Sequence, residues 1–329
     1  MNYKNIGGNI MNKKIALISG LVIAGVIGGT LLFSNSKKEE VKDNSKEVIT
    51  VEHAVGTTKV EEEPKRIVVF DWAALDAIET LGVEGVVGVP KGSAIPTYLD
   101  KYNGEDYANI GGLKEPDLEK INELQPDLII INGRQHSFYD KLSEIAPTIS
   151  MSKEDGKYIE STTKNLNVLG DIFNKEEEVS KEFETINAKI DEINKTVKEK
   201  QYVATTLMAS DGELSVFGVD SRFGIIYNEL GFKNTDKNIK AADHGQSVSY
   251  EYIATQDSDF MFVIDKSVIS SEEGQSPAKE LLNNDLVNST KTAKNNNIVY
   301  LDTLAWYLAD GGFESTNKML DEVKSAISK

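Results

Sequence analysis

Arginine is rare in this chain, and the positions that keep it are the first candidates for ligand chemistry. Only three of the 36 Lys and Arg residues are Arg, namely Arg66, Arg134 and Arg222. A guanidinium group presents a planar fork of N–H donors that fits the paired oxygens of an anion. Arg134 and Arg222 fall in loops predicted at sheet ends, so we expect both to contact an anionic ligand. Arg66 precedes a predicted strand and is interpreted as structural.

A short internal repeat supplies a further cation. Segments that begin Glu119-Lys-Ile and Glu251-Tyr-Ile each have an Asp eight residues after the Glu, followed by an apolar strand. Seven residues beyond that Asp, the first copy has Arg134 and the second has Lys266. Both positions follow the carboxyl end of a predicted strand, where open parallel sheets bind ligands. Two such lobes facing each other would form a cleft with positive charge on both walls.

The elements that must position these residues alternate between strands and helices, which is typical of a parallel α/β sheet. A hairpin over 48–60 comes first. The first series has predicted strands at 66–70, 86–89 and 127–131 and predicted helices at 73–81 and 118–124. The second series has predicted strands at 202–208, 260–264 and 298–301 and predicted helices at 222–230, 250–255 and 314–328.

One long amphipathic helix separates the two series. Between Glu176 and Lys198 few residues break a helix, and apolar residues recur at a spacing of three or four. This pattern predicts a rigid helix of about 35 Å, with Asn174 as its N-cap. We therefore divide the folded part into a first α/β lobe at 48–173, a bridging helix at 174–199 and a second α/β lobe at 200–329.

Residues 1–36 are interpreted as a leader with an export signal or membrane anchor. Lys13 and Lys14 precede an uncharged, mostly apolar run over 15–33, which is just long enough to span a bilayer. We expect Met11 to be the true start, because Ile6-Gly7-Gly8 back-translates to a ribosome-binding sequence. Residues 37–47 are predicted to be a polar tether.

The composition excludes several classes of function. The chain has no Cys, which excludes disulfides, Cys-ligated metals, a thiol nucleophile and a thioether lipid anchor. Its formal net charge of -17 argues against nucleic-acid binding. Hydrolase, zinc-protease, P-loop and dinucleotide-binding motifs are absent, so we do not expect an enzyme. The three His residues lie in separate segments, which argues against direct binding of a metal ion.

Several segments, taken together and in order, resemble the solute-binding proteins of iron–siderophore ABC importers. They include Pro64-Lys-Arg-Ile-Val-Val-Phe, Pro126-Asp-Leu-Ile-Ile-Ile, Ser221-Arg222-Phe-Gly224, His244-Gly-Gln-Ser-Val-Ser249 and Trp306-Tyr307-Leu-Ala-Asp-Gly-Gly312. The last three are similar to the branch that binds ferric catecholates and petrobactin. The resemblance covers about residues 48–329. It implies two Rossmann-like lobes joined by one long helix, with an intact iron chelate in the cleft between them.

The resemblance also implies which residues form the site. Arg134, Arg222 and Lys266 would form a basic triad, in which Lys266 stands where relatives often have Arg. Further candidates for contact with the ligand are His244, Tyr307, Trp306, Gln135 and Tyr139, and Asp71 and Trp72 could line the floor. Of the adjacent pair Trp306 and Tyr307, one is expected to pack in the core and Tyr307 to reach the cleft. The siderophore holds the Fe(III), so we expect no cofactor and no metal ligand from the protein.

Partners and location follow from the same resemblance. Glu119 and Glu251 would dock onto an ABC transporter permease, one from each lobe. The protein would act as a monomer at the extracytoplasmic face of the membrane, in a Gram-positive cell. Relatives there normally carry a lipidated Cys; because this chain has none, we expect the N-terminal apolar segment to be the anchor. The alternatives left open are another chelate (ferric hydroxamate, haem or cobalamin), a direct metal-ion binder and a membrane-anchored structural protein.

Overall fold

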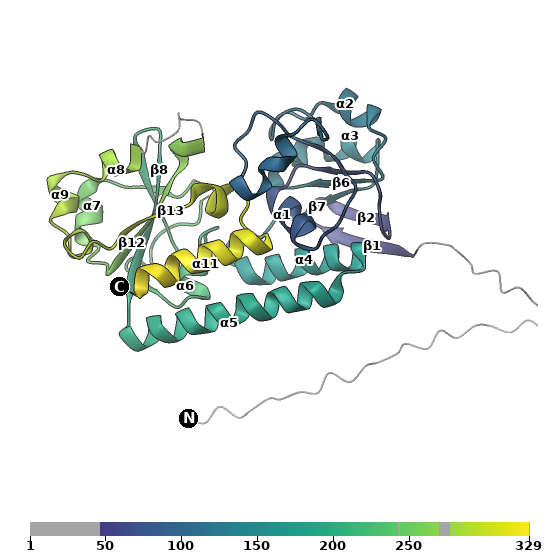
Figure 1. The fold of residues 1–329 in the computed structure, drawn as a ribbon. Helices are drawn as coiled ribbons and strands as arrows, with labels where there is room; N and C mark the ends of the chain where they lie inside the picture. The colour runs from purple at the N-terminus through teal and green to yellow at the C-terminus, as the bar shows by residue number, and fades with distance from the viewer. Residues whose placement is uncertain (1–46, 243, 270–276, 329) are drawn as a thin grey trace, which may run out of the picture. The chain divides into compact units, whose positions relative to one another are not determined.

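The computed structural model describes residues 47–242, 244–269 and 277–328 (Figure 1). The predicted leader, the anchor and Met11 fall outside these ranges, as does the predicted tether apart from Glu47. Within the described ranges, no helix combines the length and the apolar character needed to cross a bilayer.

The first lobe is built on a five-stranded sheet in which every neighbouring pair is parallel. Its order is β5-β4-β3-β6-β7, with β3 at Ile67–Val69, β4 at Val86–Val89, β5 at Ala108–Asn109, β6 at Leu128–Ile131 and β7 at Thr148–Ser150. Around it lie α1 at Trp72–Thr80, the 3-10 helix η1 at Thr97–Asn103, α2 at Leu118–Glu123, the 3-10 helix η2 at Gly133–Phe138, α3 at Tyr139–Ser143 and α4 at Tyr158–Phe173. The predicted hairpin is confirmed as β1, Val48–His53, paired with β2, Gly56–Glu61. The predicted parallel sheet is also confirmed.

The second lobe has a mixed sheet of order β11-β9-β8-β12-β13, with β10 also pairing with β8. Its strands are β8 at Val203–Ser210, β9 at Glu213–Phe217, β10 at Lys233–Asn234, β11 at Gln246–Ser247, β12 at Phe260–Asp265 and β13 at Ile298–Leu301. Its helices are α6 at Ile225–Asn228, α7 at Tyr250–Thr255, the 3-10 helix η3 at Lys266–Ile269, α8 at Pro277–Leu281, α9 at Asp285–Asn288, α10 at Lys291–Lys294, the π-helical turn η4 at Leu304–Leu308 and α11 at Phe313–Ile327.

Three local predictions were wrong or incomplete. The helix predicted at 222–230 is a single turn, α6, so Arg222 does not open a long helix. Asn174 does not cap the bridging helix; it ends α4 in a left-handed conformation, with φ of 54°. The antiparallel β9 was not predicted, although Asp211 and Gly212, both with positive φ, form the two-residue turn that joins it to β8.

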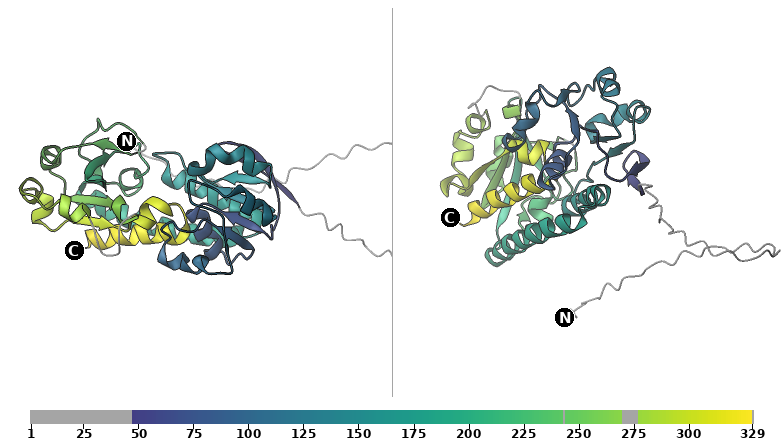
Figure 2. Two further views of the ribbon diagram at one scale, coloured as in Figure 1. Left: turned by 90° about the horizontal axis from the view of Figure 1, so that it is seen from above. Right: turned by 45° about the vertical axis from the view of Figure 1, so that its right-hand side comes forward.

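The predicted bridging helix is α5, which runs from Glu176 to Lys200. Its apolar face is buried against α4 from the first lobe and α11 from the second. On its polar side Lys189 pairs with Asp321 at 2.8 Å and Glu192 pairs with Lys324 at 2.7 Å, both on α11. Figure 1 shows α5 running alongside both lobes, and it is seen again in the right-hand view of Figure 2.

The internal repeat has a structural reason. Asp127, just before β6, accepts hydrogen bonds from the backbone N–H groups of Lys65 and Arg66 at 2.7 and 2.8 Å, at the start of β3. Asp259, just before β12, accepts one from the backbone N–H of Val203 at 2.9 Å, at the start of β8. In each lobe the carboxylate therefore fixes one central strand beside the next, so that the segments after β6 and β12 begin at equivalent sheet edges.

A buried carboxylate links the start of the last helix to the first lobe. Asp76 on α1 is fully buried, and its two oxygens accept hydrogen bonds from the backbone N–H groups of Glu314 and Ser315 at 2.9 and 2.8 Å. The hydroxyl of Tyr98 donates to the same carboxylate at 2.9 Å. A side chain at Gly312 would collide with Asp76. The first turn of α11, which follows the second sheet, therefore begins on a carboxylate from the first lobe.

Candidate ligand-binding site

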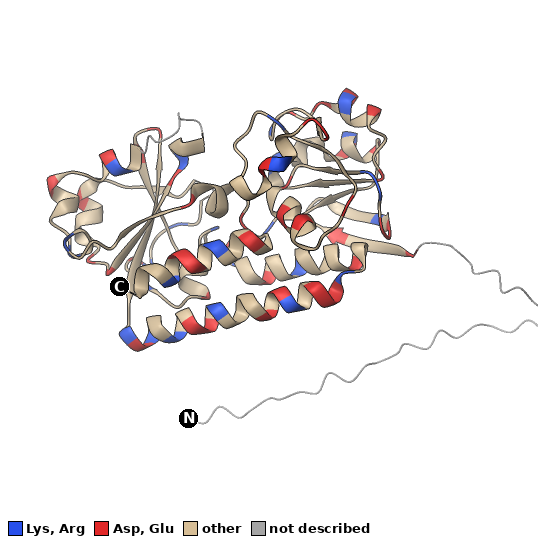
Figure 3. Cartoon of the chain, in the orientation of Figure 1, with Lys and Arg blue, Asp and Glu red and all other residues tan. Residues whose placement is uncertain are grey.

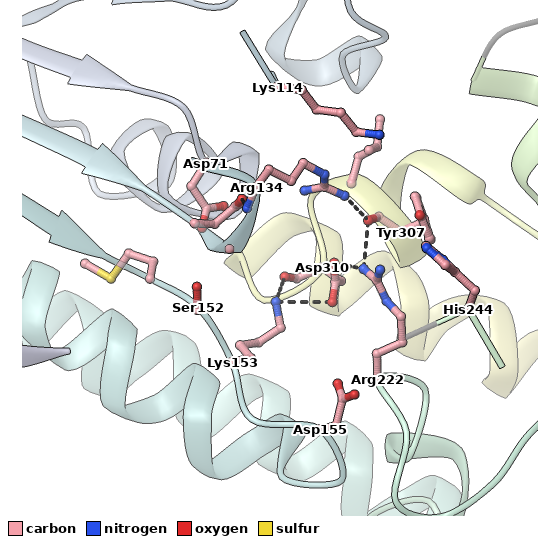
Figure 4. A pocket seen from close by; sticks show the side chains of 14 residues that line it. Asp71, Lys114, Arg134, Ser152, Lys153, Asp155, Arg222, His244, Tyr307 and Asp310 are labelled. Atoms are coloured by element: carbon pink, nitrogen blue, oxygen red, sulfur yellow. Dashed lines mark hydrogen bonds and ion pairs between the residues drawn. The ribbon is translucent and has the colours of Figure 1, made fainter. Parts of the chain in front are cut away.

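A pocket of about 410 Å³ lies between the carboxyl edges of the two sheets and draws its lining from both lobes (Figure 4). Its charged lining residues are Lys114, Arg134, Lys153, Arg222, Asp71, Asp155 and Asp310. His244 and Tyr307 complete its second-lobe side. The strand-end rule led to this pocket in the first lobe, through Arg134, but its second-lobe residue, Lys266, does not line the pocket.

Arg134 is positioned by the turn that follows β6. The side-chain oxygen of Asn132 accepts a hydrogen bond from the backbone N–H of Arg134 at 3.1 Å, and that of Gln135 accepts from the backbone N–H of Asn132 at 3.0 Å. Gln135 also donates to the carbonyl of Leu113 and is fully buried, so it fixes the turn that carries Arg134. Among the described residues, the Arg134 guanidinium has no carboxylate partner within ion-pair distance.

Arg222 approaches from the second lobe and meets Arg134 at one residue, Tyr307. The Tyr307 carbonyl accepts from Arg222 Nη2 at 2.9 Å and from Arg134 Nη2 at 3.4 Å. The two guanidinium carbons also lie 4.3 and 5.8 Å from the centre of the Tyr307 ring. The Nε of Arg222 is buried and has no hydrogen-bond partner among the described residues. Tyr307 therefore holds two like charges close together, through its carbonyl and the face of its ring.

Asp310 binds two of the pocket cations at once. Its carboxylate lies 3.2 Å from Arg222 Nη2 and 3.1 Å from Lys153 Nζ, and its side chain is 8% exposed. Lys153 also donates to the Asp310 carbonyl. Asp71 lines the same pocket and caps α1 by accepting from the backbone N–H of Ala73 at 2.8 Å.

Several predicted site residues have other contacts in the structure. Trp306 is buried, and its indole N–H donates to Glu322 at 2.7 Å. The hydroxyl of Tyr139 lies 3.2 Å from that of Thr58 on the β1–β2 hairpin, away from the pocket lining. Trp72 is also a core residue, and Lys266 begins η3 without lining this pocket. Arg66 donates to the carbonyl of Leu124 at the end of α2, which confirms its structural interpretation.

The sequence analysis missed two cations of the lining, Lys114 and Lys153. Because nearly all basic residues of the chain are Lys, residue type gave no signal for either position. Lys153 follows β7 by three positions, so the strand-end rule would have found it had that strand been predicted. Among the described residues, no group of three or more His, Asp or Glu side chains could hold a metal ion.

Glu119 and Glu251 occupy matching exposed positions, one on each lobe. Each lies in the first turn of its helix, α2 or α7, behind the N-cap side chains of Asp117 and Ser249. A hydrogen bond from Ser249 holds the pKa of Glu251 below its ordinary value. Asp and Glu residues occur in both lobes and along α5 (Figure 3).

The buried carboxyl of Asp71 predicts a measurable pH dependence of stability. Burial raises its pKa above the ordinary 3.8, and the charge of Lys153 only partly opposes this. The contribution of the Asp71 carboxyl to the stability of the wild type is therefore lost as the pH rises through its folded-state pKa, and it is recovered on acidification. We expect Asp71→Asn, which keeps the cap without titrating, to raise the thermal midpoint at about pH 8 and to lose this advantage at lower pH.

Measuring the thermal midpoints of the wild type and of Asp71→Asn over a range of pH isolates the effect of the Asp71 carboxyl. Burial also lowers the pKa of His53 and His136, which shifts stability in the opposite direction, but both histidines are present in wild type and variant alike. A difference in thermal midpoint that does not change with pH would contradict the role of the Asp71 carboxyl.

Two α/β lobes, a long connecting helix and a cationic pocket between the sheets define a two-lobed ligand-binding protein. The sequence profile of the periplasmic binding protein family matches residues 67–304, and the chain belongs to this family of solute-binding proteins.

Named relatives extend this result. The chain is 42% identical to the petrobactin-binding protein YclQ of Bacillus subtilis over 322 residues, covering 97% of this chain and 100% of YclQ. The YclQ crystal structure matches with a TM-score of 0.82 and 43% identity, covering 86% of this chain and 100% of that one. The periplasmic catecholate-siderophore binding protein VctP of Vibrio cholerae matches with a TM-score of 0.80 and 37% identity, covering 85% and 100%. The ferric-anguibactin-binding protein FatB of Vibrio anguillarum is 31% identical over 280 residues, 84% of this chain and 86% of FatB.

Proposed function

We propose that this protein captures a ferric siderophore of the catecholate or petrobactin type outside the cytoplasm and delivers it to an ABC permease for iron uptake. The observation that carries the proposal is the meeting of Arg134 and Arg222, from different lobes, at Tyr307 in one pocket. A ferric catecholate is an anion whose iron-bound oxygens can still accept hydrogen bonds, so it suits forked N–H donors converging from two sides. The names of YclQ and VctP support this ligand class.

The site residues follow from this proposal. Arg134 and Arg222 donate to chelate oxygens, while His244 and Tyr307 complete the lining. A ligand contact by Lys266 stays a prediction, because it rests on the repeat and not on the pocket lining. The iron is cargo held by the siderophore, and the protein acts as a binding protein with no cofactor and no catalytic step.

Fluorescence titration tests the proposed function. Trp72 and Trp306 are each adjacent in sequence to a pocket residue, so a coloured chelate in the pocket should quench them. We expect quenching by ferric petrobactin or a ferric tris-catecholate, and weaker or no quenching by a ferric hydroxamate, haem or cobalamin. The proposal would be overturned if neither catecholate-type chelate quenched the fluorescence of the folded protein. Quenching by one of the other compounds would identify the alternative ligand.

We further propose that Glu119 and Glu251 dock onto basic residues of the permease. Both are exposed, they occupy repeated positions, and the two lie on separate lobes. The double variant Glu119→Ala/Glu251→Ala is expected to bind the chelate normally but to lose iron uptake in cells. The matched control is Glu52→Ala/Glu213→Ala, which also removes one exposed carboxylate per lobe. Equal uptake by the two double variants would reject the docking role.

The remaining proposals concern the chain as a whole. The apolar run over 15–33 would hold the protein at the outer face of the membrane, since the chain has no Cys to carry a lipid. The protein would act as a monomer, with lobes at 48–173 and 200–329 joined by the helix at 174–199.

A further inference from the structure

We infer that Asp310 sets the net charge of the chelate that this pocket accepts. This inference rests on the proposed function and deepens it, because it assigns selectivity to a carboxylate among the cations. Among the charged lining residues, Lys114 and Arg134 form an open half, and Lys153, Arg222 and Asp310 form a paired half (Figure 4). Asp71 and Asp155 add two further carboxylates to the lining.

The paired half already contains an anion. Asp310 lies within 3.2 Å of Arg222 and 3.1 Å of Lys153, and its nearly complete burial prevents the carboxylate from turning to solvent. Its single negative charge therefore offsets one of the two positive charges that this half could offer a ligand at short range.

The open half is not neutralised in this way. Within the part of the chain that the structure describes, neither Arg134 nor Lys114 has a carboxylate within ion-pair distance. Among the described residues, the Arg134 guanidinium has one hydrogen-bond acceptor, the carbonyl of Tyr307 at a long distance of 3.4 Å. Its remaining N–H donors are the best placed in the pocket to receive chelate oxygens, so the anionic end of the ligand should lie against this half.

Charge balance then restricts the ligand. Three catecholate dianions around one Fe(III) leave a trianion, which would place part of its charge close to Asp310. A chelate that carries protonated amines, or fewer anionic donors, avoids this repulsion and still satisfies Arg134. The pocket therefore favours ferric chelates of reduced net negative charge over a trianionic tris-catecholate.

Two charge-removing variants with opposite expected effects test the role of Asp310. The probes are ferric enterobactin, a trianion, and a synthetic ferric tris-catecholate whose linker carries two protonated amines. Asp310→Asn should raise the affinity for the trianion by about 10-fold relative to the amine-bearing probe. Lys153→Gln leaves Asp310 less compensated and should shift the same affinity ratio the other way.

The opposite signs separate electrostatics from damage to the fold. Loss of packing would weaken the binding of both probes in both variants. Thermal unfolding of each variant checks that it folds. The inference is overturned if the affinity ratio does not change, or if both variants move it in the same direction. If Asp310→Asn does not fold, the sign of the shift in Lys153→Gln decides alone. Wild-type protein that binds neither probe would instead reject the proposed function.

Discussion

Replacing Asp76 with Ala is expected to lower the free energy of unfolding by roughly 3 kcal/mol or more. The substitution removes the acceptor for the backbone N–H groups of Glu314 and Ser315 and for the hydroxyl of Tyr98, at a position that is fully buried. It also leaves a void between α1 and α11. Urea denaturation of wild type and variant measures the change.

Matched variants assign this effect to the contact between α1 and α11. Asp191→Ala removes an exposed Asp from α5 and should change stability by less than about 0.5 kcal/mol. Gly312→Ala should destabilise the wild type because the new methyl group meets the Asp76 carboxyl, but should cost less in the Asp76→Ala background. Strictly additive effects of these two substitutions would contradict the proposed contact.

The second large effect is expected in ligand affinity. Arg134→Gln should lower the affinity for the ferric chelate by about 10- to 100-fold, the range expected when a charged hydrogen-bond donor to an anion is lost. Arg222→Gln should cost less, since Asp310 already compensates Arg222 but no described carboxylate compensates Arg134. Equilibrium titration of the three proteins with the same chelate measures both losses.

Arg66 provides the control, because it is the remaining Arg of the chain and serves the fold. Its guanidinium donates to the carbonyls of Leu124 and Gln125 at the end of α2. Arg66→Gln should therefore reduce stability without changing affinity. An affinity loss as large as that of Arg134→Gln would mean that the effect comes from arginine loss in general and not from the pocket.

The sequence predicted most of the fold because its signals were local and strong. Buried strands such as β6 and β12 are continuous apolar runs bounded by an Asp, and α5 has a regular apolar face. The missed elements had weaker or competing signals: the polar residues of α4 masked its buried face, and the run after Arg222 is apolar but makes only one helical turn.

The site was predictable to the extent that it depends on strand ends and residue rarity. Arg134 and Arg222 line one pocket, as their positions indicated, while the role of Asp310 could not be read from the sequence. An Asp near two cations is recognised only when the fold brings residues 153, 222 and 310 together. Gln135 and Trp306 illustrate the opposite case, in which neighbours of pocket residues in sequence serve the core.

The contact of Asp76 with α11 also has a consequence for folding order. The carboxylate belongs to the first helix of the first sheet, but its partners are backbone groups in the last helix of the chain. The N-terminal half therefore cannot complete its own core until the C-terminal residues have been made and have docked on it. We expect the lobes to unfold in one cooperative transition, and a chain truncated before α11 to lose the structure of its first lobe as well.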